Sequence, residues 1–197
     1  MSTWVVVLVK DFDSAKQRLV PALDPAERRA LARRNAVRAI RAAAAGDHRL
    51  VVAGSDDAAA LAESLGVDAL LEPRQEGQNV AAQRGIGHAL GGGADAVLLL
   101  SSDLPLVTAR SVRELLAAAA LLIPPAVMAV PAVGRGGTNA LYLNPPRAIG
   151  LHFGADSLAA FRREARNQNV HFALHQSPTM ALDLDEPADL ARLRRAV

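Results

Sequence analysis

Short apolar segments alternate with alanine-rich helical segments through the first two thirds of the chain, and this alternation constrains the fold more than any other feature. It is the pattern of βαβ units, in which helices connect parallel strands. The segment Ala96 to Leu100 contains only aliphatic residues, as expected for a central strand that is covered on both faces. We therefore predict an α/β fold with a mostly parallel central sheet flanked by helices.

We predict one domain over residues 1–197, because a chain of this length can bury one core and no repeat or linker divides it. Asp24 followed by Pro25 suits the N-cap and first turn of a helix. The predicted strands are Thr3 to Val9, Leu50 to Ala53, Ala69 to Leu71, Ala96 to Leu100, Ala126 to Val130, Ala140 to Leu143, Val170 to Leu174 and Ala181 to Asp183. The predicted helices are Pro25 to Ala45, Asp56 to Leu65, Asn79 to Leu90, Thr108 to about Leu122, Ser157 to Asn167 and Pro187 to Arg195.

Composition excludes several functional classes. Cysteine is absent, which excludes thiol catalysis, cysteine-based zinc sites and disulfide bonds, and the histidines show no zinc-ligand spacing. The apolar runs are far shorter than a membrane span and no charged leader opens the chain, so we expect a cytoplasmic protein without a membrane partner. The net charge is only +2 and aromatic residues are few, so we expect no nucleic-acid partner.

A basic loop follows the first predicted strand and contains Lys10, Lys16 and Arg18. Lysine binds phosphate oxygens as a point charge and arginine as a two-pronged donor, so this loop could hold a polyphosphate. An exposed basic loop without a ligand explains the local composition equally well. The Walker phosphate-binding pattern is absent, which disfavours a P-loop kinase.

Carboxylates follow two apolar segments, at the strand ends where an open α/β sheet binds its ligands. Asp103 comes after the segment Ala96 to Leu100, and Asp183 and Asp185 come at the end of the last predicted strand. Taken singly, Asp103 suits a turn and Asp185 suits the N-cap of the last helix. Taken together, the three carboxylates suit Mg²⁺, which binds a few carboxylates and completes its octahedron with water and phosphate oxygens.

Two glycine-containing segments have the character of anion sites. Gly136-Gly137-Thr138 precedes a predicted strand, and Gly154 and Ser157 precede a predicted helix. Glycine lets backbone N–H groups approach an anion closely, and a helix N-terminus favours negative charge. A plain turn and a plain cap are the alternatives, and the two hydroxyls favour a phosphate or carboxylate site only modestly.

Five motifs occur in one order along the chain: V-K-x-F-x-x-A-K-x-R-L, S-D-L-P-L, G-G-T-N-A-L, F-G-x-x-S and L-D-L-D-E-P-x-D-L. With this set the chain resembles, from Val5 to Leu190, the CofC/FbiD family of guanylyltransferases of coenzyme F420 biosynthesis. The resemblance implies a GT-A-like, Rossmann-type nucleotidyltransferase fold. It also implies transfer of GMP from GTP to phosphoenolpyruvate or 2-phospho-L-lactate, with loss of pyrophosphate.

The resemblance further implies a role for each matching position. Lys16 and Asp103 are the expected catalytic residues. An acceptor phosphate is already anionic near neutral pH, so catalysis needs alignment and charge neutralisation and no general base. The implied sites are Asp103, Asp183 and Asp185 for Mg²⁺; Lys10, Lys16, Arg18 and Asn79 for GTP; and Thr138, Gly154 and Ser157 for the small phosphorylated three-carbon acid.

The chain departs from the family pattern at three places. Gln78 replaces a usual Leu, the Gly-Gly-Thr-Asn turn is short, and Ser101-Ser102 precedes the aspartate. These departures leave the choice of acceptor open. The resemblance also favours a homodimer. Two other functions remain open: a sugar-nucleotide-dependent glycosyltransferase, since Asp183-x-Asp185 resembles its metal motif, and a non-catalytic nucleotide-binding subunit of the same fold.

Overall fold

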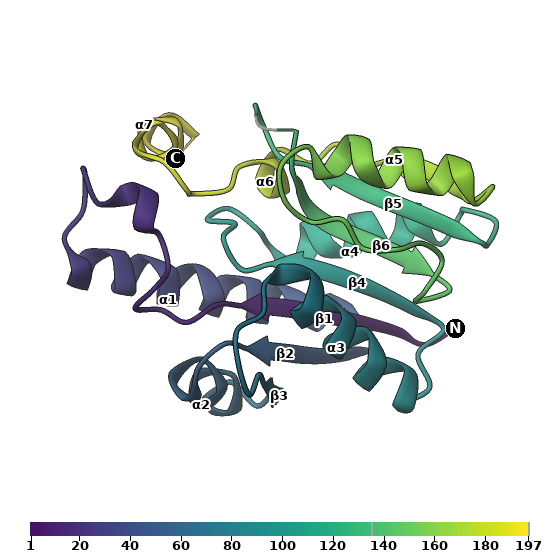
Figure 1. The fold of residues 1–197 in the computed structure, drawn as a ribbon, viewed down its shortest axis with the longest axis horizontal. Helices are drawn as coiled ribbons and strands as arrows, with labels where there is room; N and C mark the ends of the chain where they lie inside the picture. The colour runs from purple at the N-terminus through teal and green to yellow at the C-terminus, as the bar shows by residue number, and fades with distance from the viewer. Residues whose placement is uncertain (135, 197) are drawn as a thin grey trace.

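A sheet of seven strands runs through the middle of the molecule in the computed structural model, which describes residues 1–134 and 136–196 (Figure 1). The strands are β1 (Thr3–Val9), β2 (His48–Ala53), β3 (Asp68–Leu71), β4 (Ala96–Ser101), β5 (Ala126–Pro131), β6 (Thr138–Asn144) and β7 (His171–Leu174). The helices are α1 (Pro25–Ala42), α2 (Asp56–Ser64), α3 (Gln78–Gly91), α4 (Ala109–Ala119), α5 (Ser157–Asn167), α6 (Pro178–Ala181) and α7 (Pro187–Ala196), with 3₁₀ turns η1 (Gln17–Leu19) and η2 (Ala43–Ala45).

The strands lie in the order β3-β2-β1-β4-β6-β5-β7. Strand β1 pairs in parallel with β2 and β4, β2 with β3, and β5 with β7, whereas β6 is antiparallel to β4 and β5. The prediction of a mostly parallel sheet is confirmed. The chain order reverses at β1, because β2 lies on one side of it and β4 on the other, and ligands bind at such a switch point in open α/β sheets.

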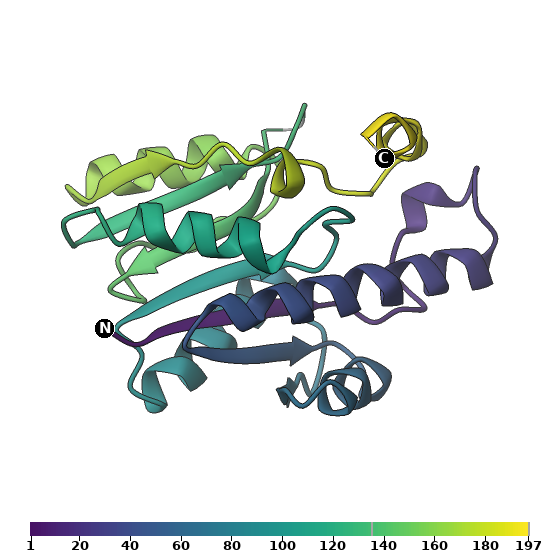
Figure 2. The same ribbon diagram turned by 180° about the vertical axis from the view of Figure 1, so that it is seen from behind.

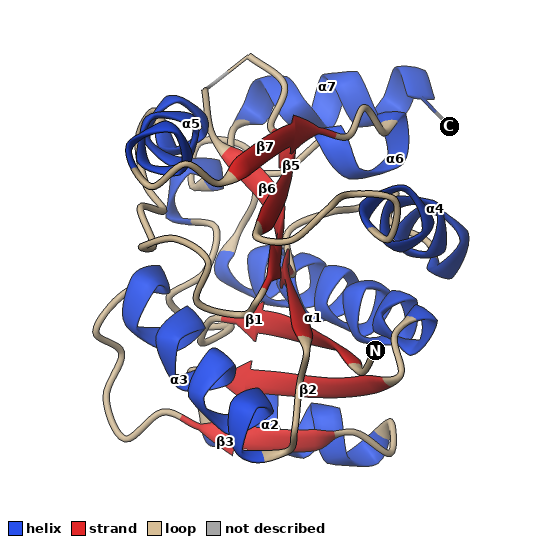
Figure 3. Cartoon of the chain, turned by 90° about the vertical axis from the view of Figure 1, so that its right-hand side faces the viewer, coloured by secondary structure: helices blue, strands red, loops and turns tan. Residues whose placement is uncertain are grey.

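Helices cover both faces of the sheet, with α3 and α5 on one face and α1 and α4 on the other (Figures 1, 2 and 3). Successive strand residues point to opposite faces of the sheet, so the aliphatic side chains of β1 pack into the hydrophobic cores on both faces. Val5 and Val7 belong to the core under α1, α2 and α4, and Val6 and Leu8 to the core under α3 and α5. An unbroken apolar strand is therefore required here.

The starts of two helices follow from local sequence. Asp24 accepts a hydrogen bond from the N–H of Glu27, whose side chain accepts one from the N–H of Asp24, so α1 begins with a capping box. Thr108 and Ser111 make the equivalent pair at α4. The Asp24 cap lies where the sequence predicts it, and α4 begins one residue after the predicted start at Thr108.

The predicted strand Ala181 to Asp183 is wrong, because the chain there forms the short helix α6 and then a loop. The backbone groups that would form hydrogen bonds in a β-sheet have other partners here. The side-chain amide of Asn139 donates to the carbonyls of Met180 and Ala181, at 2.9 and 3.1 Å. The N–H of Leu184 donates to the carbonyl of Asp103. Apolar side chains are buried without a strand, so the burial pattern alone misleads. The other predicted elements are present, with ends that differ by at most three residues.

Within the described residues, every helix is too short or too polar to cross a membrane.

We expect Gly85→Ala to destabilise the fold by about 1–3 kcal/mol, because overpacking a closely packed contact costs this much. A Cβ at Gly85 would lie 2.5 Å from Val6 and 3.0 Å from Val52, where α3 meets the sheet. Gly87→Ala on the same helix is the matched control: its Cβ meets nothing within 4 Å, and alanine should stabilise the helix by about 0.5–1 kcal/mol. Urea unfolding, followed through the single tryptophan, measures both changes. Equal effects of the two substitutions would contradict the close contact.

Candidate functional site

The carboxyl ends of β1 and β4 and the amino end of β6 meet at one edge of the sheet. Lys10 follows β1, and Asp103 lies two residues beyond β4. Thr138 joins them because β6 is antiparallel to β4, which brings its first residue to the end of the sheet where β4 finishes. The topology thus gathers groups that lie more than 100 residues apart in the chain.

A cavity of about 370 Å³ opens at this edge. All of the predicted site residues line it except Lys16 and Asn79; the lining includes Lys10, Arg18, Asp103, Thr138, Gly154, Ser157, Asp183 and Asp185. A second cavity of about 270 Å³ lies beside it and shares Lys10, Arg18, Asp103 and Asp185, with Lys16 in its wall. The structure therefore brings the predicted basic loop and the predicted carboxylates to one place.

Lys16 is the buried link between these segments. Its ammonium Nζ lies 2.6 Å from Oδ1 of Asp103 and donates a hydrogen bond of 2.5 Å to the carbonyl oxygen of Leu184. The Lys16 side chain is only 1 % exposed and that of Asp103 is 32 % exposed. The ammonium joins the N-terminal loop to both acidic segments, and its phosphate-binding role stays a prediction.

Hydrogen bonds within the loop and apolar packing against other segments hold the loop that carries Lys16. Burial acts to raise the pKa of Asp11, but hydrogen bonds from Ser14 and from the backbone of Asp13 outweigh it, so the pKa lies below its usual value. Leu19 packs with Leu31 and Leu184 in a small cluster separate from the two main cores. The loop and the segment before α7 therefore lie side by side, as Figures 1 and 2 show.

Arg18 reaches the acidic segment from the solvent side. Its Nη1 lies 3.1 Å from Oδ2 of Asp185 and 3.5 Å from Oε1 of Glu186, and its side chain is 66 % exposed. Exposed ion pairs contribute little to stability, so this guanidinium can exchange a carboxylate for another anion at low cost. This geometry suits a group that binds a charged ligand.

Three carboxylates of the cavity have the chemistry of a divalent-cation site. Asp103, Asp183 and Asp185 line the same cavity, and oxygen donors of this kind suit Mg²⁺. In the part of the chain that the structure describes, no three His, Cys, Asp or Glu side chains form a ready metal cluster. The residues thus fit Mg²⁺ by chemistry, with Lys16 holding one of the carboxylates.

Two hydroxyl-bearing residues also line the cavity. Ser157 Oγ donates a hydrogen bond of 3.1 Å to Thr138 Oγ1, and both residues are buried. Ser157 is the first residue of α5, and the next N–H, that of Leu158, donates to the carbonyl of Gly136. The glycine turn before β6 and the start of α5 thus form one unit beside the carboxylates.

Asn79 lies outside the lining of either cavity and acts on the loop before α5. Its side-chain amide donates to the carbonyl of Phe153 at 3.1 Å and accepts from the N–H of Phe153 at 2.8 Å. The neighbouring Gln78 lines the cavity instead. Direct contact of Asn79 with a nucleotide stays a prediction, whereas its bracing of the loop that carries Gly154 is observed.

Two organising residues were not predicted from the sequence. Asn139 holds the segment before Asp183 through the two carbonyls described above. Asp189, 1 % exposed, accepts hydrogen bonds from the N–H groups of Asp185 and Glu186. The sequence carried a signal for Asn139, because a polar side chain next to an apolar strand needs a partner once it is buried.

Comparison with known proteins gives a consistent result. The family model described as "Guanylyl transferase CofC like" matches residues 3–194. The chain is 39 % identical to a phosphoenolpyruvate guanylyltransferase from Rubrobacter xylanophilus, over 98 % of this chain and 94 % of that protein. It is 32 % identical to a 2-phospho-L-lactate guanylyltransferase from Methanothermobacter thermautotrophicus (98 % and 84 %) and 31 % identical to a 3-phospho-D-glycerate guanylyltransferase from Colwellia psychrerythraea (98 % and 91 %).

Solved structures share the fold at low sequence identity. A crystal structure from Desulfovibrio desulfuricans, described as a candidate nucleotide-diphospho-sugar transferase, gives a TM-score of 0.76 at 20 % identity, over 100 % of this chain and 88 % of the other. A nucleotidyl transferase from Methanothermobacter thermautotrophicus gives 0.68 at 17 % identity, over 99 % and 97 %. These likenesses confirm the predicted nucleotidyltransferase-type fold.

We expect Lys16→Met to lower the free energy of unfolding by about 1–3 kcal/mol, because it leaves Asp103 without its counter-charge and Leu184 without its donor. The partial exposure of Asp103 keeps the effect below that of a fully buried pair. Lys10→Met is the control, since an exposed side chain should change stability by less than about 0.5 kcal/mol. Urea unfolding of both variants measures the difference, and equal stabilities would show that the ammonium bridge contributes nothing.

Proposed function

Because the chain belongs to the CofC-like guanylyltransferase family, we propose that it transfers GMP from GTP to the phosphate of a small phosphorylated acid, phosphoenolpyruvate or 2-phospho-L-lactate. Membership confirms the resemblance that the five motifs predicted, and the protein is an enzyme of the nucleotidyltransferase class. The proposed reaction is a step of coenzyme F420 biosynthesis. It releases pyrophosphate as the second product.

One observation carries the proposal: cationic, acidic and hydroxyl groups line a single cavity at the switch point of the sheet. Lys10 and Arg18 supply positive charge to its lining. Thr138 and Ser157 supply hydroxyls to the same lining. Two anionic substrates can therefore lie in one cavity with different partners, as a transfer between two phosphates requires.

In the reaction an oxygen of the acceptor phosphate attacks the α-phosphorus of GTP. A new P–O–P bond forms, the bond between the α-phosphorus and the bridging oxygen breaks, and pyrophosphate leaves with the electron pair. Lys10 and Arg18 hold the triphosphate, and the unit of Gly154, Thr138 and Ser157 holds the acceptor. Alignment of the two phosphates and neutralisation of the leaving charge supply the rate enhancement.

Asp103, Asp183 and Asp185 are the residues that would hold Mg²⁺. A bound divalent cation would neutralise the charge that develops on the departing pyrophosphate. Lys16 keeps the Asp103 carboxylate in a defined position, and Asn139 does the same for the segment before Asp183. The protein's own contribution is therefore to keep three carboxylates from two segments on one cavity.

The relatives named above act on three different phosphorylated acids, which share a phosphate and a carboxylate on a three-carbon skeleton. Hydroxyls and backbone N–H groups suit both anionic groups. Pocket shape distinguishes the acids, and phosphoenolpyruvate and 2-phospho-L-lactate are the proposed pair.

The experiment that tests the function incubates the purified protein with GTP and Mg²⁺ and with each of the three acids in turn. Pyrophosphate release and a product mass equal to acid plus GMP minus water are the expected results. Release of a nucleoside diphosphate would contradict the proposal in favour of glycosyl transfer. Tight GTP binding without turnover would indicate a binding subunit.

We expect Asp103→Asn and Asp183→Asn each to lower turnover by at least about a thousandfold, because each removes a negative charge that holds the cation at the transferred phosphates. Asp68→Asn, an exposed carboxylate at the start of β3, should leave turnover unchanged. Circular dichroism checks that all three variants are folded. Near-normal turnover of either site variant would contradict the metal assignment.

We expect Asn79→Ala to raise the KM for the acceptor about tenfold while the KM for GTP changes by less than about twofold. The substitution removes both hydrogen bonds that hold Phe153 beside Gly154, and hydrogen bonds of this kind are worth about 1 kcal/mol each. Gln83→Ala, exposed on the same helix, should change neither constant. If the KM for GTP rises most, Asn79 contacts the nucleotide as the sequence predicts.

A further inference from the structure

A row of arginine side chains on α5 lines a cavity that the proposed reaction does not use. Helix α5 lies at the outside of the molecule (Figures 1 and 3). The cavity has a volume of about 350 Å³, and Arg162, Arg163 and Arg166 belong to its lining. Gly136 and Asp156 line it as well. We call it the α5 cavity.

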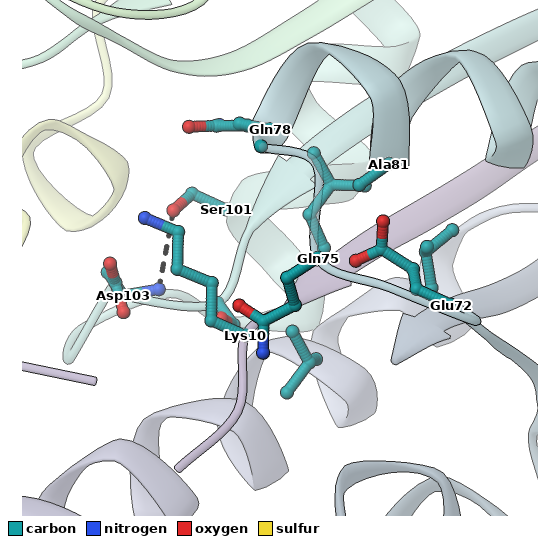
Figure 4. A pocket seen from close by; sticks show the side chains of 12 residues that line it. Lys10, Glu72, Gln75, Gln78, Ala81, Ser101 and Asp103 are labelled. Carbon is teal, nitrogen blue, oxygen red and sulfur yellow. Dashed lines mark hydrogen bonds between the residues drawn. The ribbon is translucent and has the colours of Figure 1, made fainter. Parts of the chain in front are cut away.

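The α5 cavity is separate from the reaction site. Figure 4 shows a pocket that contains Lys10 and Asp103, two residues of the site cavity, so that pocket adjoins the reaction site. In the described part of the chain, the α5 cavity shares no lining residue with either of them. It is nevertheless a neighbour of the site cavity, because Asp156 directly precedes Ser157, which lines the site cavity.

We propose that the α5 cavity is a second anion site, which binds a small molecule with two or more phosphate or carboxylate groups. The inference goes beyond the proposed reaction and does not depend on it, because no residue that lines the α5 cavity has a part in that reaction.

The spacing of the arginines places them on one face of the helix. Residues three and four apart are neighbours on a helix surface, so Arg166 lies next to both Arg162 and Arg163. All three side chains are exposed. Glu164 is the one acidic residue of α5, and its carboxylate lies 3.6 Å from Nε2 of His152 in the loop before the helix. The acidic and basic groups of α5 therefore have different surroundings.

The positive charge of this helix face is not balanced by ion pairs. None of the ion pairs formed between described residues includes Arg162, Arg163 or Arg166. Asp156 is the one carboxylate in the described lining, and it lies against Gly136, where an added Cβ would be 2.8 Å from its Oδ1. Like charges at helical spacing repel each other, so an anion bound among the three guanidinium groups would relieve that repulsion.

Two contacts hold parts of the cavity in place without a ligand. The guanidinium carbon of Arg162 lies 5.8 Å from the centroid of the Phe172 ring, a cation–π contact with β7. The N–H of Leu158 donates to the carbonyl of Gly136 at 3.0 Å, which ties the turn before β6 to the start of α5. Groups that are already ordered lose less entropy when a ligand binds.

The chemistry of the lining indicates the class of ligand. A guanidinium group donates two parallel hydrogen bonds to a phosphate or a carboxylate, and three such groups suit a ligand with more than one of these anions. The volume falls within the range of small-molecule sites, about 300–1,000 Å³. The described lining contains no aromatic ring on which a base could stack, which disfavours a nucleic acid.

The test measures binding of inorganic tripolyphosphate and of citrate by titration calorimetry, at about 0.15 M salt so that diffuse surface attraction is screened. The α5 variant carries Arg162→Gln, Arg163→Gln and Arg166→Gln. Wild-type protein should bind one more equivalent of at least one probe than the α5 variant does. An extra equivalent of tripolyphosphate identifies a phosphate ligand, and one of citrate identifies a carboxylate ligand.

The matched control removes the same charge from another exposed helix face. It carries Arg33→Gln, Arg34→Gln and Arg41→Gln on α1 and should keep the wild-type number of bound probes. Equal binding by wild-type protein and the α5 variant would overturn the proposal. An equal loss in both variants would also overturn it, because the arginines would then act only through net charge.

A single substitution keeps the test decisive if circular dichroism shows that the α5 variant is not folded. Arg163→Gln should weaken binding at the extra site at least about tenfold, because a hydrogen bond between charged groups is worth roughly this much. Unchanged affinity in Arg163→Gln would overturn the role of the arginine row.

Discussion

The buried ammonium of Lys16 is the interaction on which the site depends. It contacts Asp103 after β4 and the carbonyl of Leu184 before α7, so three distant segments share one cation. A lysine buried in this way must be compensated, because an unpaired charge in a protein interior is very costly. The compensation fixes the distance between the two acidic segments, and the cavity between them follows from it. Leu19, Leu31 and Leu184 add a small apolar cluster that keeps the same segments together.

The charge balance of the cavity supports the proposed binding of anionic substrates. The carboxylates have cationic neighbours, a buried one in Lys16 and an exposed one in Arg18, and these differ in how readily they can be exchanged. The exposed guanidinium can turn to an incoming phosphate, whereas the buried ammonium keeps its partners and preserves the geometry. The hydroxyl pair of Thr138 and Ser157 belongs to the same cavity as these carboxylates.

Most of the sheet could be predicted, because a strand covered on both faces must be apolar throughout and few sequences satisfy that condition by chance. The wrong prediction of a strand at Ala181 to Asp183 comes from the same rule, because that rule takes a run of apolar residues to indicate a strand. Met180, Leu182 and Leu184 are buried, but a loop can bury alternate side chains if other groups satisfy its backbone, and here Asn139 does so. Asn79 shows the corresponding limit for side chains. Its position in a motif indicated importance, and only the structure revealed that its amide holds Phe153.

The sequence by itself determined the α/β class, the family and the identity of the groups that line the site, because aliphatic runs, caps and ordered motifs are local properties of the chain. Only the tertiary structure decided which of those groups meet. The antiparallel direction of β6 brings Thr138 to the end of β4, and the partners of Lys16 lie in segments that are distant in the sequence. Each of these depends on strand order and on packing between distant segments. Hydrophobic burial drives that packing but is non-directional, so the local sequence does not show which distant groups will become partners.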